Sequence, residues 1–287
     1  MRHKQALLAG LMAILLLAGC GPSQSLPEMP AQPPPIPQRI VSLNPCVDAI
    51  LLQVADPAQI AAISHYSHDP RATSVPLAVA MRFRAIDASA EEILALRPDL
   101  VIAGPHAALP TIQALHRLRI PLVKTTVPDS VASSAAQIRE IAAATGHGPR
   151  GEALITRIEA ALAGAEAKGG APIPALIWNG GGLVPGTGTL ADEMLTRAGF
   201  SNASADYGLE KWDILPLEPL LVHPPAILFA ANGRAERDRV LSHPVLRRAA
   251  KDMMITEFAP RLLFCGGPTI IDAMANLAAV RLRLGQS

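Results

Sequence analysis

The 287-residue sequence is poor in aromatic and charged side chains, and these shortages exclude several classes of function. Aromatic residues make up 3% of the chain, charged residues make up 17%, and the formal net charge is +1. No stripe of lysine and arginine is interleaved with aromatic residues, so nucleic acid is not an expected partner. The sequence also contains no P-loop, no G-x-S-x-G elbow and no paired-carboxylate motif, so we do not expect an enzyme.

Long hydrophobic runs are also scarce, and the run at residues 6–18 is too short to span a membrane comfortably. A basic start precedes this run, and residues 17–20 read Leu-Ala-Gly-Cys. This tetrapeptide resembles the lipobox of bacterial lipoprotein precursors, which implies cleavage before Cys20 and lipidation of that residue. We therefore expect a signal peptide over residues 1–19 and no spanning helix after it. An ordinary signal peptide that happens to contain a cysteine is the alternative.

Composition then divides the rest of the chain. Residues 20–38 are rich in proline and predict a semi-extended tether behind the lipidated cysteine. Strand-like and helix-like segments alternate over residues 39–128 and again over 169–287, which predicts two α/β lobes with parallel sheets. Residues 129–168 have helical spacing and predict a helical linker, whose second half is one long helix.

The expected elements follow from apolar periodicity and turn residues. They are strands at 39–43, 60–64, 100–103, 121–124, 175–178 and 226–230, a helix ending at 53, and helices at 88–96, 111–118, 152–167, 191–198, 217–222 and 269–284.

One helix-to-strand unit occurs twice, once in each predicted lobe. Residues 90–105 read AEEILALRPDLVIAGP, and residues 217–232 read LEPLLVHPPAILFAAN. Glu91 and Glu218 each stand seven positions ahead of a proline, with an apolar helical stretch between them and a strand-like run after the proline. The repeat indicates that the two lobes are structurally related.

Residues 180–191 contain the pattern G-x-G-x-x-A, with Asp206 twenty positions after Gly186. A dinucleotide fingerprint needs its first glycine in a tight turn directly after the strand. Here seven residues separate Trp178 from Gly186, and a proline precedes that glycine. We therefore interpret the segment as a glycine-rich loop in which Thr189 caps the next helix.

Three histidines follow predicted strands of the first lobe. His65 and His68 belong to the sequence HisTyrSerHisAsp, and His106 follows the strand ending at 103. Because ligands bind at the carboxyl ends of parallel strands, these side chains are candidates for a metal site. No general-base glutamate stands beside them, so ligand-contacting or solvent-facing histidines are the default. The alternatives that remain are a zinc or manganese receptor and a metal-dependent enzyme.

The few aromatic residues and cysteines also mark the gap between the lobes. We expect Tyr66, Trp178 and Trp212 to expose their rings there. Cys46 and Cys265 each precede a helix, one in each lobe. Since a disulfide would lock the lobes together, we favour two free or ligand-facing thiols, with a structural disulfide as the main competitor.

Taken together, several segments resemble the cobalamin and iron-siderophore class of periplasmic substrate-binding proteins, which serve ABC importers. They are residues 39–51, the unit 91–103, the helix between Gly186 and Gly199, and the Trp212, Glu218, Pro225 spacing. The HisTyrSerHisAspPro loop resembles the cleft loop of the cobalamin-binding members.

The resemblance implies two α/β lobes joined by one long helix, with the ligand held in the cleft between them. It also implies that Glu91 and Glu218 pair with arginines of the two permease subunits. The ligand contacts that we assign are Asn44, Cys46, His65, Tyr66, His68, His106, Trp178, Trp212 and Cys265. Few arginines lie at expected cleft positions, which places a corrinoid ahead of a ferric siderophore or haem. The expected protein is a monomeric, non-catalytic lipoprotein of the periplasm, or of the cell surface in a host without an outer membrane.

Overall fold

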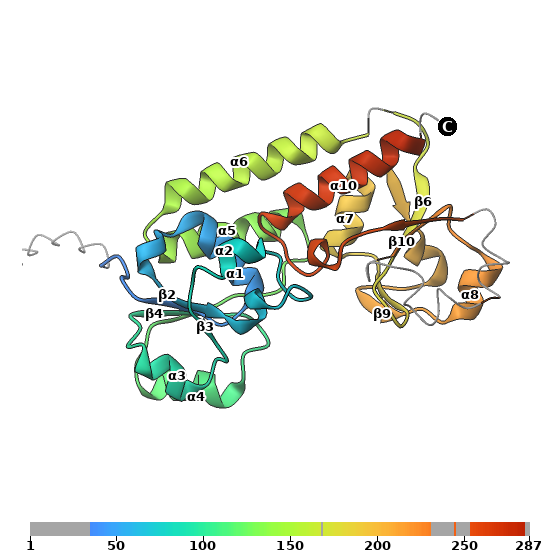
Figure 1. Ribbon diagram of the computed structural model, residues 1–287. Coiled ribbons are helices and arrows are strands. Elements are labelled where there is room, and N and C mark those ends of the chain that lie inside the picture. The colour runs from blue at the N-terminus through green and yellow to red at the C-terminus, as the bar shows by residue number, and fades with distance from the viewer. Residues whose placement is uncertain (1–34, 168, 231–243, 245–252, 285–287) are drawn as a thin grey trace, which may run out of the picture. The chain divides into compact units, whose positions relative to one another are not determined.

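The structure is a computed structural model that describes residues 35–167, 169–230, 244 and 253–284 (Figure 1). The expected signal peptide, Cys20 and most of the tether lie outside the described residues. Both sheets of the protein belong to one unit, residues 36–287. Within the described part of the chain, no helix combines the length and apolar character needed to cross a membrane.

The first lobe is built on a five-stranded sheet with the order β3-β2-β1-β4-β5. Every neighbouring pair in it is parallel. Its strands are β1 (Ile40–Ser42), β2 (Ile60–Ser64), β3 (Ala85–Ile86), β4 (Leu100–Ala103) and β5 (Leu122–Lys124).

The second lobe is built on a four-stranded parallel sheet with the order β11-β10-β6-β8. Its strands are β6 (Ile173–Trp178), β8 (Phe200–Asn202), β10 (Ile227–Ala230) and β11 (Met254–Glu257). A separate antiparallel ribbon pairs β7 (Leu183–Pro185) with β9 (Trp212–Ile214). In each main sheet the first strand, β1 or β6, has the second strand, β2 or β8, on one side and the pair β4-β5 or β10-β11 on the other, and β3 is an extra edge strand beside β2 in the first sheet. The lobes are therefore topologically equivalent, as the repeat in the sequence predicts.

Helices cover these sheets. They are α1 (Pro45–Val54), α2 (Leu77–Ala80), α3 (Ala90–Ala95), α4 (Leu109–Arg117), α5 (Val131–Ala144), α6 (Gly148–Ala165), α7 (Leu190–Arg197), α8 (Leu217–Val222) and α10 (Thr269–Leu284). Short 3-10 turns add η1 (Pro57–Gln59), η2 (His65–His68), η3 (Ala203–Tyr207) and η5 (Pro260–Leu262).

Local chemistry explains where several of these helices begin. The side chains of Asn44, Ser130 and Thr189 accept backbone N–H groups at the starts of α1, α5 and α7. Such caps satisfy backbone donors that have no partner within the helix. The predicted cap at Thr189 is confirmed.

The strands alternate their side chains between two hydrophobic layers. In β10, Ile227 and Phe229 face the main core, whereas Leu228 and Ala230 face a second cluster. The same main core contains Ile40 and Ile102 from the first sheet and buried residues of α1, α5, α6, α7 and α10. The hydrophobic core is therefore continuous from one sheet to the other, and the two lobes share it beneath α1, α5, α6, α7 and α10.

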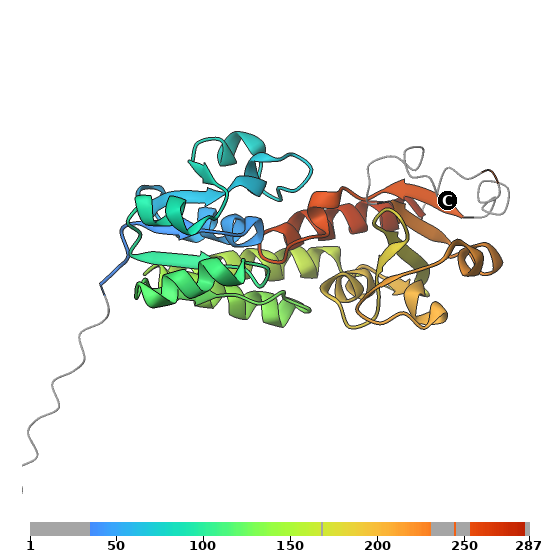
Figure 2. The same ribbon diagram turned by 90° about the horizontal axis from the view of Figure 1, so that it is seen from below.

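The long helix α6 leads from the first lobe to β6, the first strand of the second lobe. It packs against α1, α5 and α10, and Figures 1 and 2 both show α10 beside it. The helix begins at Gly148, four residues before the predicted start, with Pro149 in its first turn. Proline is favoured there because its missing N–H would have no partner within the helix.

Candidate functional site

The carboxyl edge of the first sheet faces the second lobe. Cys46, in the first turn of α1 after β1, is covalently bonded to Cys265 of the second lobe. Ser74, in the segment after η2, donates a hydrogen bond of 2.8 Å to the carbonyl oxygen of Arg261. Because parallel strands end at a common edge, the loops after β2 and β4 lie along the same side. In α/β folds, ligands bind at this edge of the sheet.

A cavity of about 290 Å³ lies between the lobes at this edge. It is lined by the loop after β5, the start of α7, the strand β9 and the segment before α10. The lining residues are Val127, Pro128, Asp129, Gly188, Thr189, Leu190, Ala191, Met194, Lys211, Trp212, Leu263, Phe264, Cys265 and Gly266. Trp212 and Phe264 are 41% and 43% exposed, so two aromatic rings of the second lobe remain partly open to solvent here.

The preference for free thiols is wrong. Cys46 and Cys265 form a disulfide with a Cα–Cα distance of 5.1 Å. The bond joins the start of α1 to the segment before α10, and Cys265 is 3% exposed. Neither sulfur is therefore a free thiol for a ligand, and the two cysteines fasten the lobes at one end of the cleft.

Two glycines pack next to this disulfide. A Cβ added to Gly266 would lie 2.7 Å from Ser134 Oγ, and one added to Gly267 would lie 2.7 Å from Ile50 Cγ1. The Gly267 backbone N–H also donates a buried hydrogen bond of 2.7 Å to Ser134 Oγ. The segment before α10 thus fits against α1 and α5 only because both residues lack a side chain. We call this contact, made by Cys46, Ile50, Ser134 and 265–267, the lobe joint.

The turn η2 places His65 and Tyr66 at the carboxyl edge of the first sheet. Their ring centroids are 4.0 Å apart, and Tyr66 is 52% exposed. His65 Nδ1 lies 3.2 Å from the carbonyl oxygen of Ile86 and 3.3 Å from Asp87 Oδ1. These contacts hold the imidazole in place and leave the phenol ring of Tyr66 open to solvent.

Beneath this turn lies a buried carboxyl group, that of Asp48, which is not among the site residues expected from the sequence. Asp48 is fully buried, and its Oδ2 accepts hydrogen bonds from Ser67 Oγ at 2.6 Å and from the Ser64 N–H at 3.0 Å. Burial raises the pKa of Asp48 to about 7, although the neighbouring polar groups of Ser42, Ser67 and Ser64 act in the opposite direction. An acidic residue on the apolar face of α1 was the signal in the sequence.

The histidines do not assemble a metal site. His68 Nε2 lies 3.1 Å from the carbonyl oxygen of Ala80, and His106 is exposed on the loop after β4. Within the described ranges, no group of three or more His, Cys, Asp or Glu side chains is arranged to hold a metal ion. The geometry therefore gives the metal-receptor and metalloenzyme alternatives no support.

The expectation that Trp178 exposes its ring is wrong. Trp178 is 1% exposed and lies in the hydrophobic cluster that also contains Leu176 and Leu228. It is the last residue of β6, and alternation along the strand places it on the same face as Leu176.

Asn44 is partly buried, and its side-chain oxygen accepts hydrogen bonds from the backbone N–H groups of Cys46 and Val47.

The glycine-rich segment is not a nucleotide loop. Gly186 continues the β7 ribbon, and its N–H donates to the carbonyl oxygen of Lys211. A Cβ there would lie within 2.9 Å of the backbone at 209–211, so the close approach that Gly186 permits is to this protein's own chain.

Glu91 and Glu218 occupy equivalent positions in the two lobes. Each is the second residue of a six-residue helix, α3 or α8, and each is exposed. The strand that follows, β4 or β10, lies directly beside the first strand of its sheet and is buried throughout.

Near the end of α8, the Tyr207 hydroxyl donates a 2.5 Å hydrogen bond to the carbonyl oxygen of His223. Burial raises the pKa of Tyr207 to about 12.

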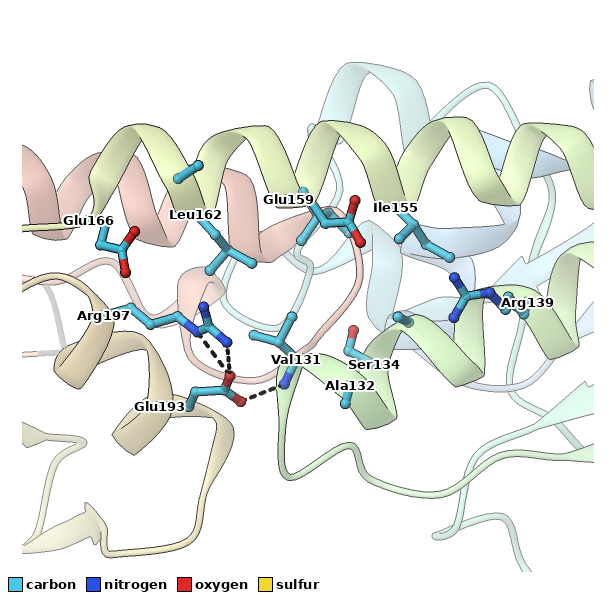
Figure 3. A pocket seen from close by; sticks show the side chains of 13 residues that line it. Val131, Ala132, Ser134, Arg139, Ile155, Glu159, Leu162, Glu166, Glu193 and Arg197 are labelled. Carbon is cyan, nitrogen blue, oxygen red and sulfur yellow. Dashed lines mark hydrogen bonds and ion pairs between the residues drawn. The ribbon is translucent and has the colours of Figure 1, made fainter.

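A second cavity, of about 460 Å³, lies between α5, α6 and α7 (Figure 3). Glu193 of α7 accepts a 2.7 Å hydrogen bond from the backbone N–H of Val131 at the start of α5, and it also pairs with Arg197. Apolar side chains of these helices line it together with the charged side chains of Arg139, Glu159 and Glu166. Because the cavity lies among helices and not at the strand ends, we assign it to the contact between the lobes.

Two α/β lobes of like topology, with a cavity between them at the strand ends, define the class of two-lobed binding folds. A family model described as periplasmic binding protein matches residues 40–252, and the chain belongs to this family. A search of curated proteins gave no match.

Solved structures agree with the fold. The periplasmic heme-binding protein RhuT from Roseiflexus sp. RS-1, in apo form, is 24% identical, with a TM-score of 0.67 over 86% of this chain and 98% of that one. A periplasmic heme-binding protein from Pseudomonas aeruginosa is 24% identical, with a TM-score of 0.68 over 85% and 92% of the two chains. The periplasmic vitamin B12 binding protein BtuF of Vibrio cholerae is 18% identical, with a TM-score of 0.66 over 88% and 99%.

Proposed function

We propose that this protein is the solute-binding component of an ABC importer and that it captures a metal-chelate nutrient between its lobes. The observation that carries the proposal is the set of exposed rings at the inter-lobe edge: Tyr66 on the first lobe, and Trp212 and Phe264 on the second. Aromatic rings that are open to solvent at a cleft can be buried by a flat, apolar ligand, which stabilises the complex.

We propose a corrinoid as the first candidate ligand, followed by haem and then a ferric siderophore. Two cationic side chains near the cleft are already paired: Arg71 bonds to Asp69, and Lys211 Nζ lies 3.9 Å from Asp129. This pairing disfavours a strongly anionic siderophore. The heme- and vitamin B12-binding neighbours are consistent with a ligand of the tetrapyrrole type. The cavity is at the lower end of the range of small-molecule pockets, about 300–1,000 Å³, so the ligand would extend beyond it toward Tyr66.

Delivery would use the two exposed acids. We propose that Glu91 and Glu218 form charge-assisted contacts with the two halves of a permease dimer, and that acyl chains on Cys20 tether the protein to the membrane. The equivalent positions of these acids in two topologically equivalent lobes support the first proposal. A pair of matching charges suits a partner with two matching halves.

The test is a thermal-shift panel of cyanocobalamin, cobinamide, haemin and a ferric siderophore, with zinc and manganese ions as separate arms. A ligand at one hundred times its Kd should stabilise the protein by about 2.7 kcal/mol. Tyr66→Ala and Trp212→Ala should weaken binding of the stabilising chelate. Leu282→Ala, which removes a more exposed apolar side chain in the last turn of α10, should not. Stabilisation by a free metal ion alone would contradict the proposal.

A further inference from the structure

The buried side chain of Asp48 contacts both ends of the turn that presents Tyr66. Asp48 lies in α1, and its Oδ2 accepts one bond from the backbone at the end of β2, at Ser64, and one from the side chain of Ser67 inside η2. These two donors bracket His65 and Tyr66 in the sequence. Both ends of the exposed part of the turn are therefore fixed to the same oxygen atom.

The same short stretch of α1 also carries the lobe joint. Cys46, two residues before Asp48, forms the disulfide with Cys265. The first turn of α1 thus anchors the second lobe through one residue and the Tyr66 turn through another. A buried donor that loses its acceptor carries a free-energy penalty, which suits Asp48 to fixing the position of a loop.

No neighbouring group among the described residues replaces Asp48 Oδ2 as the acceptor for both Ser64 and Ser67. Its Oδ1 is buried and has no hydrogen-bond partner among the described residues. His65 and His68 bond to the carbonyl oxygens of Ile86 and Ala80 and not to the carboxyl group. Ser42 Oγ is also directed to the carbonyl oxygen of Asn44, at 3.4 Å. Removal of Asp48 would leave the Ser64 N–H and the Ser67 hydroxyl without this acceptor.

We propose that Asp48 is a positioning residue that holds the His65–Tyr66 turn in the conformation that receives the ligand. This inference rests on the proposed function, because it assigns the ligand contact to Tyr66. Asp48 does not touch the ligand itself. It acts through Ser64 and Ser67, and its loss lets the turn move before the chelate binds.

The test compares Asp48→Ala, Asp48→Asn and Ser67→Ala with the wild-type protein. Kd values are measured by titration with cyanocobalamin and with haemin, and amide hydrogen exchange is followed over residues 64–68. Asp48→Ala should weaken binding of whichever chelate the wild-type protein binds by about tenfold, the size expected from the loss of hydrogen bonds to a buried acceptor. It should also accelerate exchange in the turn. Asp48→Asn keeps a carbonyl oxygen as acceptor and should restore binding to within about threefold.

The matched control is Val54→Ala, which removes buried apolar volume at the other end of α1. It should destabilise the protein yet leave the Kd and the exchange of the turn unchanged. Ser67→Ala removes one donor and leaves α1 intact, so it tests the inference even if Asp48→Ala folds poorly. Wild-type Kd values in Asp48→Ala and Ser67→Ala would overturn the positioning role while the proposed function stands. Failure of the wild-type protein to bind cyanocobalamin, haemin and the ferric siderophore of the panel would remove the proposed function, and this inference with it.

Discussion

Single residues determine whether the lobe joint can form, and Gly267 is the most constrained of them. Its φ is +64°, and a Cβ there would meet Ile50 at 2.7 Å. We expect Gly267→Ala to lower the free energy of unfolding by about 1–3 kcal/mol, because it adds both backbone strain and a steric clash. Urea denaturation measures the change.

Gly164 provides the matched control for that substitution. It is exposed in α6, and an added Cβ would meet nothing within 4 Å. Gly164→Ala should therefore be neutral or should stabilise the protein, by up to about 1 kcal/mol. An equal loss of stability in both variants would show that the joint is not the cause.

Asp48 should make stability depend on pH. Its pKa is raised to about 7 in the folded protein, from an ordinary value of 3.8, because it is buried. Between these values the folded state binds the proton more tightly than the unfolded state, so the free energy of unfolding falls as pH rises from about 4 to about 7. The free energy of unfolding that is lost in this way reaches about 4 kcal/mol, and the loss does not grow further above pH 7.

Asp48→Asn isolates this contribution. The amide does not titrate, so the variant should lack the decline between pH 4 and pH 7 that Asp48 produces in the wild-type protein. Urea denaturation at several pH values gives the difference between the two proteins. Parallel pH profiles would mean that the pKa of Asp48 is not raised above its ordinary value in the folded protein.

Among the elements, strands with a continuous apolar run and helices with a clear helical periodicity are predictable from the sequence. The strands β2 and β4 and the helices α8 and α10 have the predicted bounds. The ribbon of β7 and β9 was missed because its strands are three residues long, follow glycines or turns, and in β9 are exposed throughout. Its pairing joins segments almost thirty residues apart, which local periodicity does not reveal.

The errors at the candidate site have physical reasons as well. Trp178 was placed in the gap because the sequence does not show that a second layer covers that face of the sheet. A disulfide is disfavoured at the sequence level because it would lock the lobes together, and the sequence does not show that the two lobes share one buried core beside it. Asp48 was overlooked because the serines that hold it come from β2 and η2. Each of these facts depends on packing between elements and not on the elements themselves.

The disulfide should contribute strongly to stability, since it ties α1 to the segment before α10. We expect the double variant Cys46→Ala/Cys265→Ala to lose about 2–5 kcal/mol of unfolding free energy, measured by urea denaturation. Wild-type protein treated with a reductant should lose a comparable amount. The reductant should leave the double variant unchanged, and any further loss there would point to another cause.

For the whole molecule, the equivalent placement of Glu91 and Glu218 predicts a docking role that can be separated from ligand capture. We expect Glu91→Lys/Glu218→Lys to abolish uptake of the ligand by cells while the Kd of the purified protein stays within about twofold. Charge reversal replaces two attractive contacts with repulsive ones at the permease. Uptake assays and titrations of the same variant measure the two properties.

Glu140→Lys/Glu159→Lys is the control for that variant. Both residues are exposed on α5 and α6, and the change in net charge is the same. Uptake should be close to the wild-type level. A loss of ligand affinity in the Glu91 and Glu218 variant would contradict a role confined to docking.

The bond between Cys46 and Cys265 also changes the topology of the polypeptide. It closes the intervening chain, which contains strands of both sheets, into one covalent ring. A single peptide-bond cut at a loop inside this ring would open the ring without releasing a fragment. A protease would need to cut twice there to separate a piece of either lobe, so a nicked molecule keeps both lobes.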